Sequence, residues 1–210
     1  MSRNGRFVLW GGAGLFYAVF CLWYTNLGGP LTAPEIERFS AILETRHADP
    51  AQAQRLRAFM AADDGNQFLM LNALDLAERP SPPPGAPAGV TGQDLLDRYM
   101  TYMLPALLKR ACHPVFAGRA LADAVDLVGV ADGAHWDQGA LVRYRSLRDM
   151  LEIALDPAFQ GPHADKLAAL EKTIAYPLQP QLYLSDPRLL LALVLLVAVL
   201  LLDRRRTNHG

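Results

Sequence analysis

Two long apolar stretches, one near each end, constrain what this chain can form more than any other feature. The first runs from Phe7 to Tyr24 and the second from Leu189 to Leu202. A helix that crosses a bilayer needs about 20 mostly apolar residues. The first stretch meets this length, and the second meets it when residues 185–188 begin the helix and Arg204 extends toward the interface. The sequence therefore predicts a central domain held between two transmembrane helices.

Arginines beside the two stretches predict their orientation in a membrane. Arg3 and Arg6 precede the first stretch, and residues 204–206, all arginine, follow the second. Because basic residues that flank a span stay on the cytoplasmic side, we expect an integral inner-membrane protein with both termini cytoplasmic and the central domain periplasmic or extracytoplasmic. A cleaved signal peptide is the alternative for the first stretch. The mostly bulky residues 20–24 do not form the small-residue pattern of a cleavage site, which favours an uncleaved anchor.

Charge and cysteine content exclude some classes of protein. Between Leu31 and Ser185 the chain has 14 basic and 19 acidic side chains and no basic stripe with interleaved aromatic residues, so we expect no nucleic-acid partner. Cys21 lies in the first apolar stretch, and Cys112 is the single cysteine of the central domain. No disulfide within the domain can form, and its core must be sufficient by itself.

Helix-start signals follow the first apolar stretch. Thr32 with Glu35 has the pattern of a capping box, and Asp49 before Pro50 marks a second start. Apolar residues recur at helical spacing after each start, which predicts two short helices. We therefore expect four segments: the cytoplasmic N-terminus and first transmembrane helix in residues 1–29, a juxtamembrane helical segment in 30–64, the main domain in 65–185, and the second transmembrane helix with a basic cytoplasmic tail in 186–210.

The main domain has alternating strand and helix patterns. A near-continuous apolar run predicts a buried strand, and a proline- and glycine-rich surface loop separates it from a long amphipathic helix. The expected elements are a strand in 66–76, a helix in 91–110, strands in 113–129 and 140–146, helices in 148–155 and 163–176, and a closing strand in 177–184. This order predicts an α+β fold of the ferredoxin-like type, β-α-β-β-α-β.

Residues 59–177 carry a resemblance to a known family. The pattern consists of Asn72 at a strand end, Tyr99 and Pro105 in the helix, Gly118-Arg119, Trp136-Asp137, Tyr144-x-Ser146, and Asp156-Pro157-x-x-Gln160. In these positions the chain resembles the dimeric α/β-barrel superfamily, specifically its domain-of-unknown-function 1330 branch, which is related to EthD-like proteins. Two features depart from the usual form. Arg145 stands where the family often has proline, and the family's members are commonly small and soluble, without membrane anchors.

The resemblance implies a homodimer in which two sheets close into one barrel and leave a cavity beside each sheet. Members of this superfamily include cofactor-free monooxygenases, isomerases and haem-degrading enzymes. A shared fold does not carry an activity with it. We therefore expect a homodimer without a cofactor and assign no reaction from the resemblance.

Strand alternation suggests a pocket. If the faces bearing Asn72, Arg119 and Arg143 meet, an amide and guanidinium groups would lie in an apolar wall, which suits a carboxylate, enolate or phenolate. The alternative is that the two arginines pair with carboxylates such as Asp126, Asp137 or Glu152 and tie strands together. The candidate ligand-binding residues are Asn72, Arg119, Trp136, Arg143 and Tyr144.

His113 is the candidate general acid or base, because the pKa of histidine lies near neutrality, and a capping or surface role is its alternative. Trp136 can stack on a ligand or pack in the core. His113, His135 and His163 show no recognisable metal-ligand spacing, so we expect no metal.

Two functional classes follow from these residues. The first is a membrane-anchored dimeric module that binds a small apolar or anionic ligand or a membrane protein. The second is a cofactor-independent monooxygenase or isomerase that acts on a carbonyl or phenolic substrate through His113 and Arg119 near Asn72. A histidine and an arginine that converge on one cavity would favour the enzyme. An arginine with protein partners would favour the module.

Overall fold

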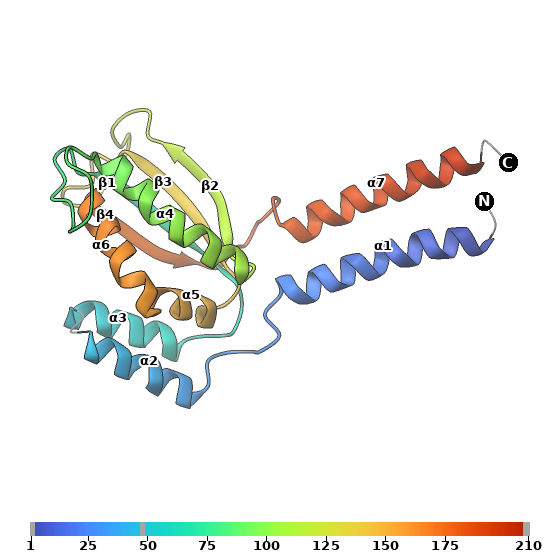
Figure 1. The fold of residues 1–210 in the computed structure, drawn as a ribbon, viewed down its shortest axis with the longest axis horizontal. Helices are drawn as coiled ribbons and strands as arrows, with labels where there is room; N and C mark the ends of the chain where they lie inside the picture. Colours follow the sequence, from blue (N-terminus) through green and yellow to red (C-terminus); the bar gives the residue numbers. More distant parts are fainter. Residues whose placement is uncertain (1–2, 47–48, 208–210) are drawn as a thin grey trace. The chain divides into compact units, whose positions relative to one another are not determined.

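The computed structural model describes residues 3–46 and 49–207, which form two compact units (Figure 1). One unit combines the two ends of the chain, up to Leu27 and from Pro180, and the other contains residues 28–179. The helices predicted in residues 30–64 and the sheet belong to the same unit.

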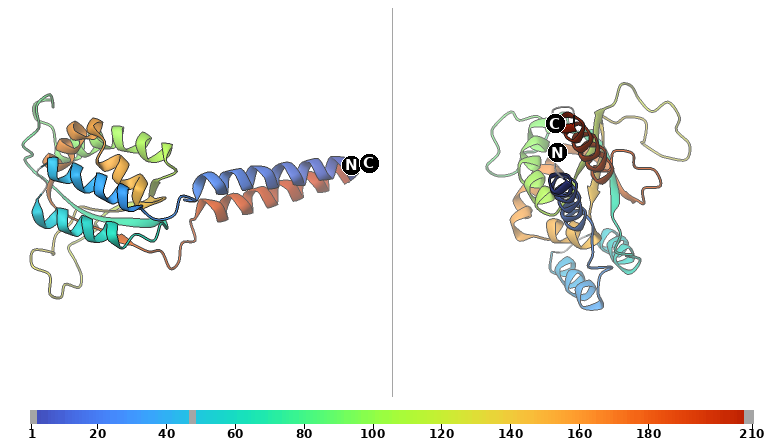
Figure 2. Two further views of the ribbon diagram at one scale, coloured as in Figure 1. Left: turned by 90° about the horizontal axis from the view of Figure 1, so that it is seen from below. Right: turned by 90° about the vertical axis from the view of Figure 1, so that its right-hand side faces the viewer.

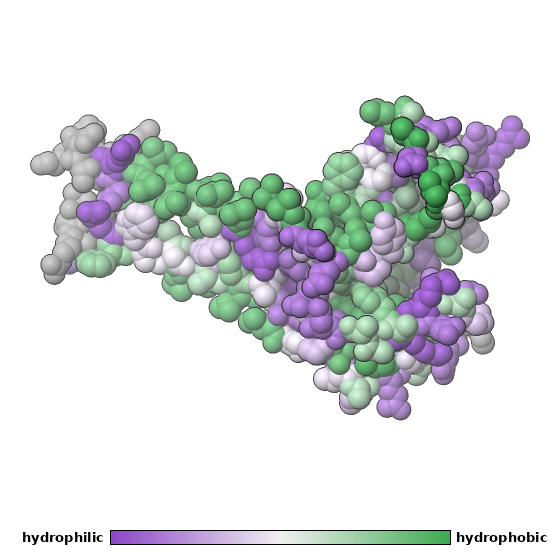
Figure 3. All heavy atoms as spheres, turned by 180° about the vertical axis from the view of Figure 1, so that it is seen from behind, coloured by the Kyte–Doolittle hydropathy of each residue, from purple (hydrophilic) through white to green (hydrophobic). Residues whose placement is uncertain are grey.

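The terminal unit is a pair of helices, α1 (Arg3–Tyr24) and α7 (Pro187–Thr207), which lie side by side (Figure 2). Near the chain termini, Arg6 Nη2 lies 2.8 Å from Asp203 Oδ2. At the other end of the pair, Arg188 Nη2 donates to Asp186 Oδ2 at 2.6 Å, and its Nη1 donates to Thr25 Oγ1 at 3.1 Å. Polar contacts therefore join the two helices at both ends. Hydrophobic side chains cover much of the helix surface between these two ends (Figure 3).

Within the described part of the chain, only α1 is long and apolar enough to cross a membrane, by length and composition. Helix α7 includes Arg188, Asp203 and Arg204 within its length. These charged residues leave it a shorter apolar centre than α1 has, although the two helices have nearly equal lengths.

Four strands form one antiparallel sheet in the second unit, which confirms the α+β class. They are β1 (Phe68–Leu76), β2 (His113–Arg119), β3 (Gln138–Tyr144) and β4 (Leu170–Leu178). The strands lie in the order β2-β3-β1-β4, and each neighbouring pair is antiparallel. Helix α4 (Gly92–Lys109) connects β1 to β2, while α5 (Leu147–Ala154) and α6 (Gln160–Ala169), with a short 3-10 turn at Pro157–Phe159, connect β3 to β4.

Helices α4, α5 and α6 lie on the same face of the sheet (Figure 2). Phe68 is opposite Tyr144 across β1 and β3, and Met70 is opposite Val142, so these side chains point to one face. They belong to a core with Leu107 and other apolar side chains of the helices. We call this the helix-covered face, and it includes every second residue of β1 from Phe68 to Leu76.

The other face of the sheet, here called the open face, is apolar and exposed. It includes Leu71 of β1 with its neighbours in register on the adjoining strands. Side chains of this face are between 36 and 58 % exposed, namely Phe116, Ile174, Tyr176 and Leu178.

Two short helices, α2 (Ala33–Thr45) and α3 (Pro50–Ala61), precede the sheet, as the sequence predicts. The Thr32 N–H donates to Glu35 Oε2 at 2.8 Å, and the Gln52 N–H donates to Asp49 Oδ2 at 2.8 Å, so both expected helix starts are confirmed. Phe39 and Leu43 of α2 share the main core with Leu151 of α5. Helices α2 and α3 are therefore integral to the α/β unit.

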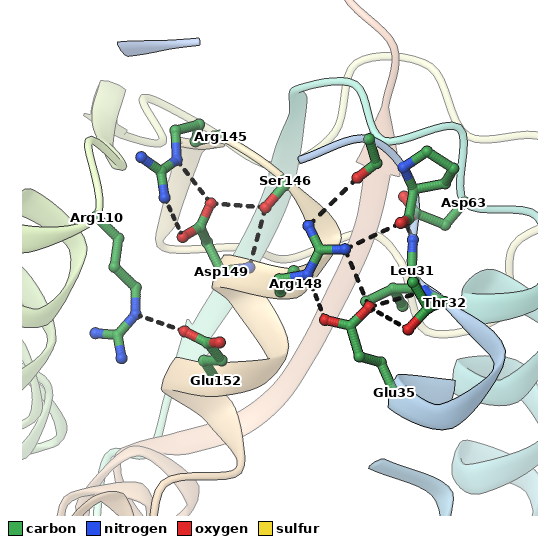
Figure 4. Close-up of polar contacts among 12 residues, drawn as sticks. Leu31, Thr32, Glu35, Asp63, Arg110, Arg145, Ser146, Arg148, Asp149 and Glu152 are labelled. Atoms are coloured by element: carbon green, nitrogen blue, oxygen red, sulfur yellow. Dashed lines mark hydrogen bonds and ion pairs between the residues drawn. The ribbon is translucent and has the colours of Figure 1, made fainter. Parts of the chain in front are cut away.

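A polar network fixes the start of α2 to α5 (Figure 4). Arg148 of α5 donates from Nε to Glu35 Oε1 at 2.6 Å and from Nη2 to the carbonyl of Pro30 at 2.9 Å. Beside it, Arg145 Nη2 donates to Asp149 Oδ1 at 2.7 Å. Arg148 thus fixes the chain that enters α2, and Arg145 fixes Asp149 in the first turn of α5.

Three boundaries differ from the sequence predictions. The second strand ends at Arg119, and residues 120–137 form a long connection to β3. The final strand is β4 in 170–178 and not 177–184, and the helix expected to reach residue 176 ends at Ala169. The apolar residues in 171–176 fit both the alternation of a strand and the spacing of a helix. Pairing with β1 makes this segment a strand. Residues 179–186 therefore separate the last strand from α7, where almost no linker was expected.

The register irregularity in β2 lies between Pro114 and Phe116. Proline has no N–H to donate to a neighbouring strand, which explains why the ladder is interrupted at this position.

Candidate functional site

The structure does not bring Asn72 and Arg143 together. Asn72 lies opposite Ala140 on the helix-covered face, where its amide donates to the Met70 carbonyl at 3.1 Å. Arg143 lies opposite Leu69, so its side chain starts on the open face. Arg143 lies three positions after Ala140 on β3, and because an odd step along a strand changes the face, the two predicted site residues lie on opposite sides of the sheet.

Arg143 is fully buried and acts as a structural tie. Its Nε donates to Gln67 Oε1 at 2.9 Å and its Nη2 donates to the same oxygen at 2.6 Å. Its Nη1 donates to the carbonyl of Ala111, a residue held at φ 55° in the turn before β2. A buried guanidinium needs such partners because an uncompensated buried charge is strongly unfavourable. Arg143 thus joins the start of β1 to the turn between α4 and β2.

The remaining predicted residues lie in separate places. Tyr144 is buried and stacks on Phe68 at 5.4 Å between ring centroids, and burial raises its pKa above the usual value. Arg119 is exposed at the end of β2. His113 lies opposite Arg143, with Nδ1 3.0 Å from the Pro114 carbonyl. Of these three side chains, Tyr144 is buried, His113 is partly exposed and Arg119 is exposed.

Trp136 also has protein partners. Its Nε1 donates to the Gly133 carbonyl at 2.8 Å, and Lys172 Nζ lies 5.2 Å from its ring centroid. The side chain is partly buried in the connection before β3. The candidate ligand-binding residues therefore do not line one common cavity.

A different cavity, of about 1100 Å³, opens within residues 28–179. Helix α2 forms one wall, α3 contributes Leu56, and the end of α5 with α6 forms the opposite wall. We call it the helical groove. Its apolar lining includes Ile42, Leu56, Leu155, Phe159 and Leu167, and its polar lining includes Arg38, Arg46, Gln52, Gln160 and His163.

The groove has a basic rim. Arg38 and Arg46 line it, and no aspartate or glutamate is among the described residues that do so. Arg46 donates from Nη2 to the Leu155 carbonyl at 2.5 Å and from Nη1 to the Ala154 carbonyl at 3.3 Å, at the C-terminal end of α5. A cation there is favoured by the exposed carbonyl groups of the helix end. Arg38 is exposed, and its Cζ lies over the Phe39 ring, 4.5 Å from the ring centroid.

His163 contributes a neutral polar group to the groove. Burial lowers the pKa of its imidazole, and the charges of Lys166 and Arg46 lower it further. The ring is therefore neutral at neutral pH and can donate or accept one hydrogen bond. An apolar groove with basic side chains, a neutral imidazole and no carboxylate suits an amphipathic anion.

The sequence contains a signal for one wall of this groove. Arg38, Ile42 and Arg46 recur every four residues, next to the core stripe of Phe39 and Leu43. This spacing places them on one side of the helix. The signal does not identify the opposite wall, because α6 follows more than a hundred residues later.

Comparisons with known proteins support the fold and leave the function open. No family model matches the chain, and no curated protein matches it. The crystal structure of methylated RPA0582 protein matches with a TM-score of 0.52 and 24% identity, covering 61% of this chain and 91% of that one. A second structure of RPA0582, described as a protein of unknown function from Rhodopseudomonas palustris, matches with a TM-score of 0.51 and 24% identity, covering 62% and 94%. At this identity the likeness shows a shared fold alone.

Proposed function

We propose that this protein is a membrane-anchored binding module that holds a small amphipathic anion in the helical groove. The observation that carries the proposal is the composition of the groove, which combines apolar walls, Arg38, Arg46 and a neutral His163 and has no carboxylate among its described lining residues. The apolar walls accommodate the hydrocarbon part of such a ligand. The arginines provide fixed positive charge for its carboxylate or phosphate head.

The membrane anchor in this proposal consists of α1 and α7 as two spans. The apolar character of α1 and its antiparallel pairing with α7 support a helical hairpin. The contact between Arg6 and Asp203 supports placing both termini on one side. The basic residues near both termini favour the cytoplasmic side, which leaves residues 28–179 on the extracytoplasmic side.

The proposed fold type is ferredoxin-like, within the dimeric α/β-barrel superfamily and its domain-of-unknown-function 1330 and EthD-like branch. The strand order β2-β3-β1-β4 with helices connecting β1 to β2 and β3 to β4 supports this assignment. The proposed partner at the open face is a second copy of this chain, because the face is apolar and spans several strands.

The enzyme alternative, a cofactor-independent monooxygenase or isomerase, lacks comparable support. It requires His113 and Arg119 to act near Asn72. His113 lies opposite Arg143 on the open side, whereas Asn72 lies on the helix-covered face. This separation favours the binding module.

Native mass spectrometry of the full chain, released from detergent in the instrument, tests the proposal with decanoate as the probe. We expect one bound decanoate per chain. Leu56→Trp, which fills the groove, and Arg38→Gln, which removes a charge at its rim, should each lower the occupancy at least about fivefold. Arg55→Gln is the matched control, because Arg55 is exposed on α3 outside the groove lining.

The proposal is wrong if Leu56→Trp leaves decanoate occupancy unchanged, or if Arg55→Gln lowers it as much as Arg38→Gln does. A spectrum of the untreated protein serves as an unbiased comparison, since a co-purified anion in the wild type that is absent from Leu56→Trp would identify the natural ligand class.

A further inference from the structure

Three potential metal ligands meet at one end of the sheet, and none of them lines the helical groove. Asp75 belongs to β1, while His135 and Asp137 come from the connection that precedes β3. His135 Nε2 lies 3.8 Å from Asp75 Oδ1 and 3.7 Å from Asp137 Oδ1. One ligand atom from each residue lies within 4.8 Å of the other two. We infer that Asp75, His135 and Asp137 form a binding site for a divalent transition-metal cation.

The histidine is oriented for this role by a further carboxylate. His135 Nδ1 lies 2.9 Å from Asp123 Oδ1. A carboxylate oxygen accepts hydrogen bonds, so this contact places the proton of a neutral imidazole on Nδ1 and leaves the Nε2 lone pair facing Asp75 and Asp137. Metal-binding histidines almost always have such a carboxylate or carbonyl partner at the second nitrogen. Asp123 is therefore the positioning residue of the site.

Each carboxylate ligand is held through one oxygen and directs the other toward His135. The Leu76 N–H donates to Asp137 Oδ2 at 2.7 Å, which leaves Oδ1 nearest the imidazole. Lys172 Nζ lies 3.4 Å from Asp75 Oδ2, again on the side away from Oδ1. Backbone and lysine contacts thus orient both carboxylates without occupying the oxygen atoms that would bind the metal.

The charge of the site also favours a cation. Asp75 is 9 % exposed, and its carboxylate is desolvated compared with one on the surface. Lys172 balances part of the negative charge of Asp75, Asp123 and Asp137, and it is held by a 2.7 Å hydrogen bond to the Asp132 carbonyl. Three carboxylates and one ammonium surround the imidazole and leave an excess of negative charge for a divalent ion. His135 and Asp137 reach the surface, which gives the ion a route from solvent.

The separations fit a metal with bonds of about 2.0–2.2 Å, which places neighbouring ligand atoms roughly 3 to 4 Å apart. Two carboxylate oxygens and one imidazole nitrogen suit Mn²⁺, Fe²⁺, Co²⁺ or Zn²⁺, with water at the remaining positions. Calcium and magnesium favour sites made of oxygen atoms alone. The ligands come from β1 and from the β2–β3 connection, and sequence spacing therefore could not reveal them.

Titration of the full chain with Co²⁺ in detergent, prepared without a polyhistidine tag, tests the site by visible absorption, and calorimetry with Zn²⁺ gives the affinity. We expect one ion per chain in the wild type. His135→Gln should weaken binding more than tenfold, and Asp123→Asn should weaken it about 10- to 100-fold while leaving all three ligands in place. His113→Gln is the matched control, because His113 lies at the start of β2 outside the cluster.

The inference is overturned if the wild type binds no Co²⁺ at millimolar concentration. It is also overturned if His135→Gln and the control bind equally. Circular dichroism in the absence of metal shows whether each variant is folded. If His135→Gln is not folded, Asp123→Asn decides the outcome, and unchanged affinity in that variant would contradict the inference that Asp123 orients His135 for a metal ion.

Discussion

Arg148 of α5 and Glu35 of α2 form a direct ion pair, with 2.6 Å between the guanidinium Nε and the carboxylate Oε1 (Figure 4). The same carboxylate accepts the Thr32 N–H in the capping box. The Glu35 side chain thus caps the start of α2 and attaches the first turn of α2 to α5. The attachment positions one wall of the helical groove relative to the other.

The ion pair makes part of the stability dependent on pH. The Arg148 guanidinium, followed by the Thr32 N–H, lowers the pKa of Glu35 to about 2 from its usual 4.5. A lowered folded-state pKa gives stability that is fully present above the unfolded pKa and is lost as the pH falls from about 4.5 toward 2. We expect Glu35→Gln to lower the free energy of unfolding by about 1–2 kcal/mol at pH 7 and by much less near pH 2. Thermal unfolding across this range measures the difference.

Glu37→Gln is the matched control for that experiment, because Glu37 is exposed on the same helix. It should change stability by less than about 0.5 kcal/mol at every pH. A loss for Glu35→Gln that stays constant from pH 7 to pH 2 would show that the carboxylate charge does not contribute.

The structural role of Arg143 gives a second prediction. Arg143→Gln removes the donors to Gln67 Oε1 and the Ala111 carbonyl and leaves buried acceptors without them. We expect a loss of about 2–4 kcal/mol in the free energy of unfolding, whereas Arg119→Gln on the exposed end of β2 should change it by less than about 0.5 kcal/mol. Thermal unfolding of both variants in detergent provides the comparison. Unchanged stability in Arg143→Gln with altered ligand retention would instead assign Arg143 to a binding site.

The sequence was informative where the signal was local. The Thr32 and Asp49 caps depend on residues three positions apart, and both were predicted correctly. The first strand was also predicted within two residues at its start, because a short continuous apolar run bounded by polar residues is typical of a strand. The final strand was placed too late, since its selection depends on pairing with β1 about a hundred residues earlier.

The candidate site was less accessible to sequence analysis. Alternation gives the face of each residue within a strand, but the register between strands decides whether two faces agree. Asn72 and Arg143 could share a face in one register and not in a register shifted by one residue. The groove and the metal ligands depend in the same way on elements that are distant in sequence and meet only in the folded chain.

Cys112 is predicted to be chemically inert in the native protein. Burial raises the pKa of its thiol to about 11, and its Sγ accepts the Arg145 N–H at 3.3 Å. The thiolate fraction at pH 7 is then about one in ten thousand, and the thiolate is the reactive form. In a Cys21→Ser background, alkylation by iodoacetamide should be at least about 100-fold slower in the folded protein than in denaturant. Rapid alkylation of the folded protein would contradict a buried structural cysteine.

The open face provides the final prediction, on the oligomeric state. Ile174 and Tyr176 of β4 lie on that face and are 43 % and 45 % exposed. If two copies pack through this face, a lysine at either position places a charge in an apolar interface, which disfavours association by several kcal/mol. We expect the wild type to be a dimer by light scattering in detergent and Ile174→Lys and Tyr176→Lys to be monomers. Leu108→Lys, at a residue 51 % exposed on α4, should remain dimeric. A dimer that survives both β4 substitutions would exclude the open face as the interface, and a monomeric wild type would exclude the dimer itself.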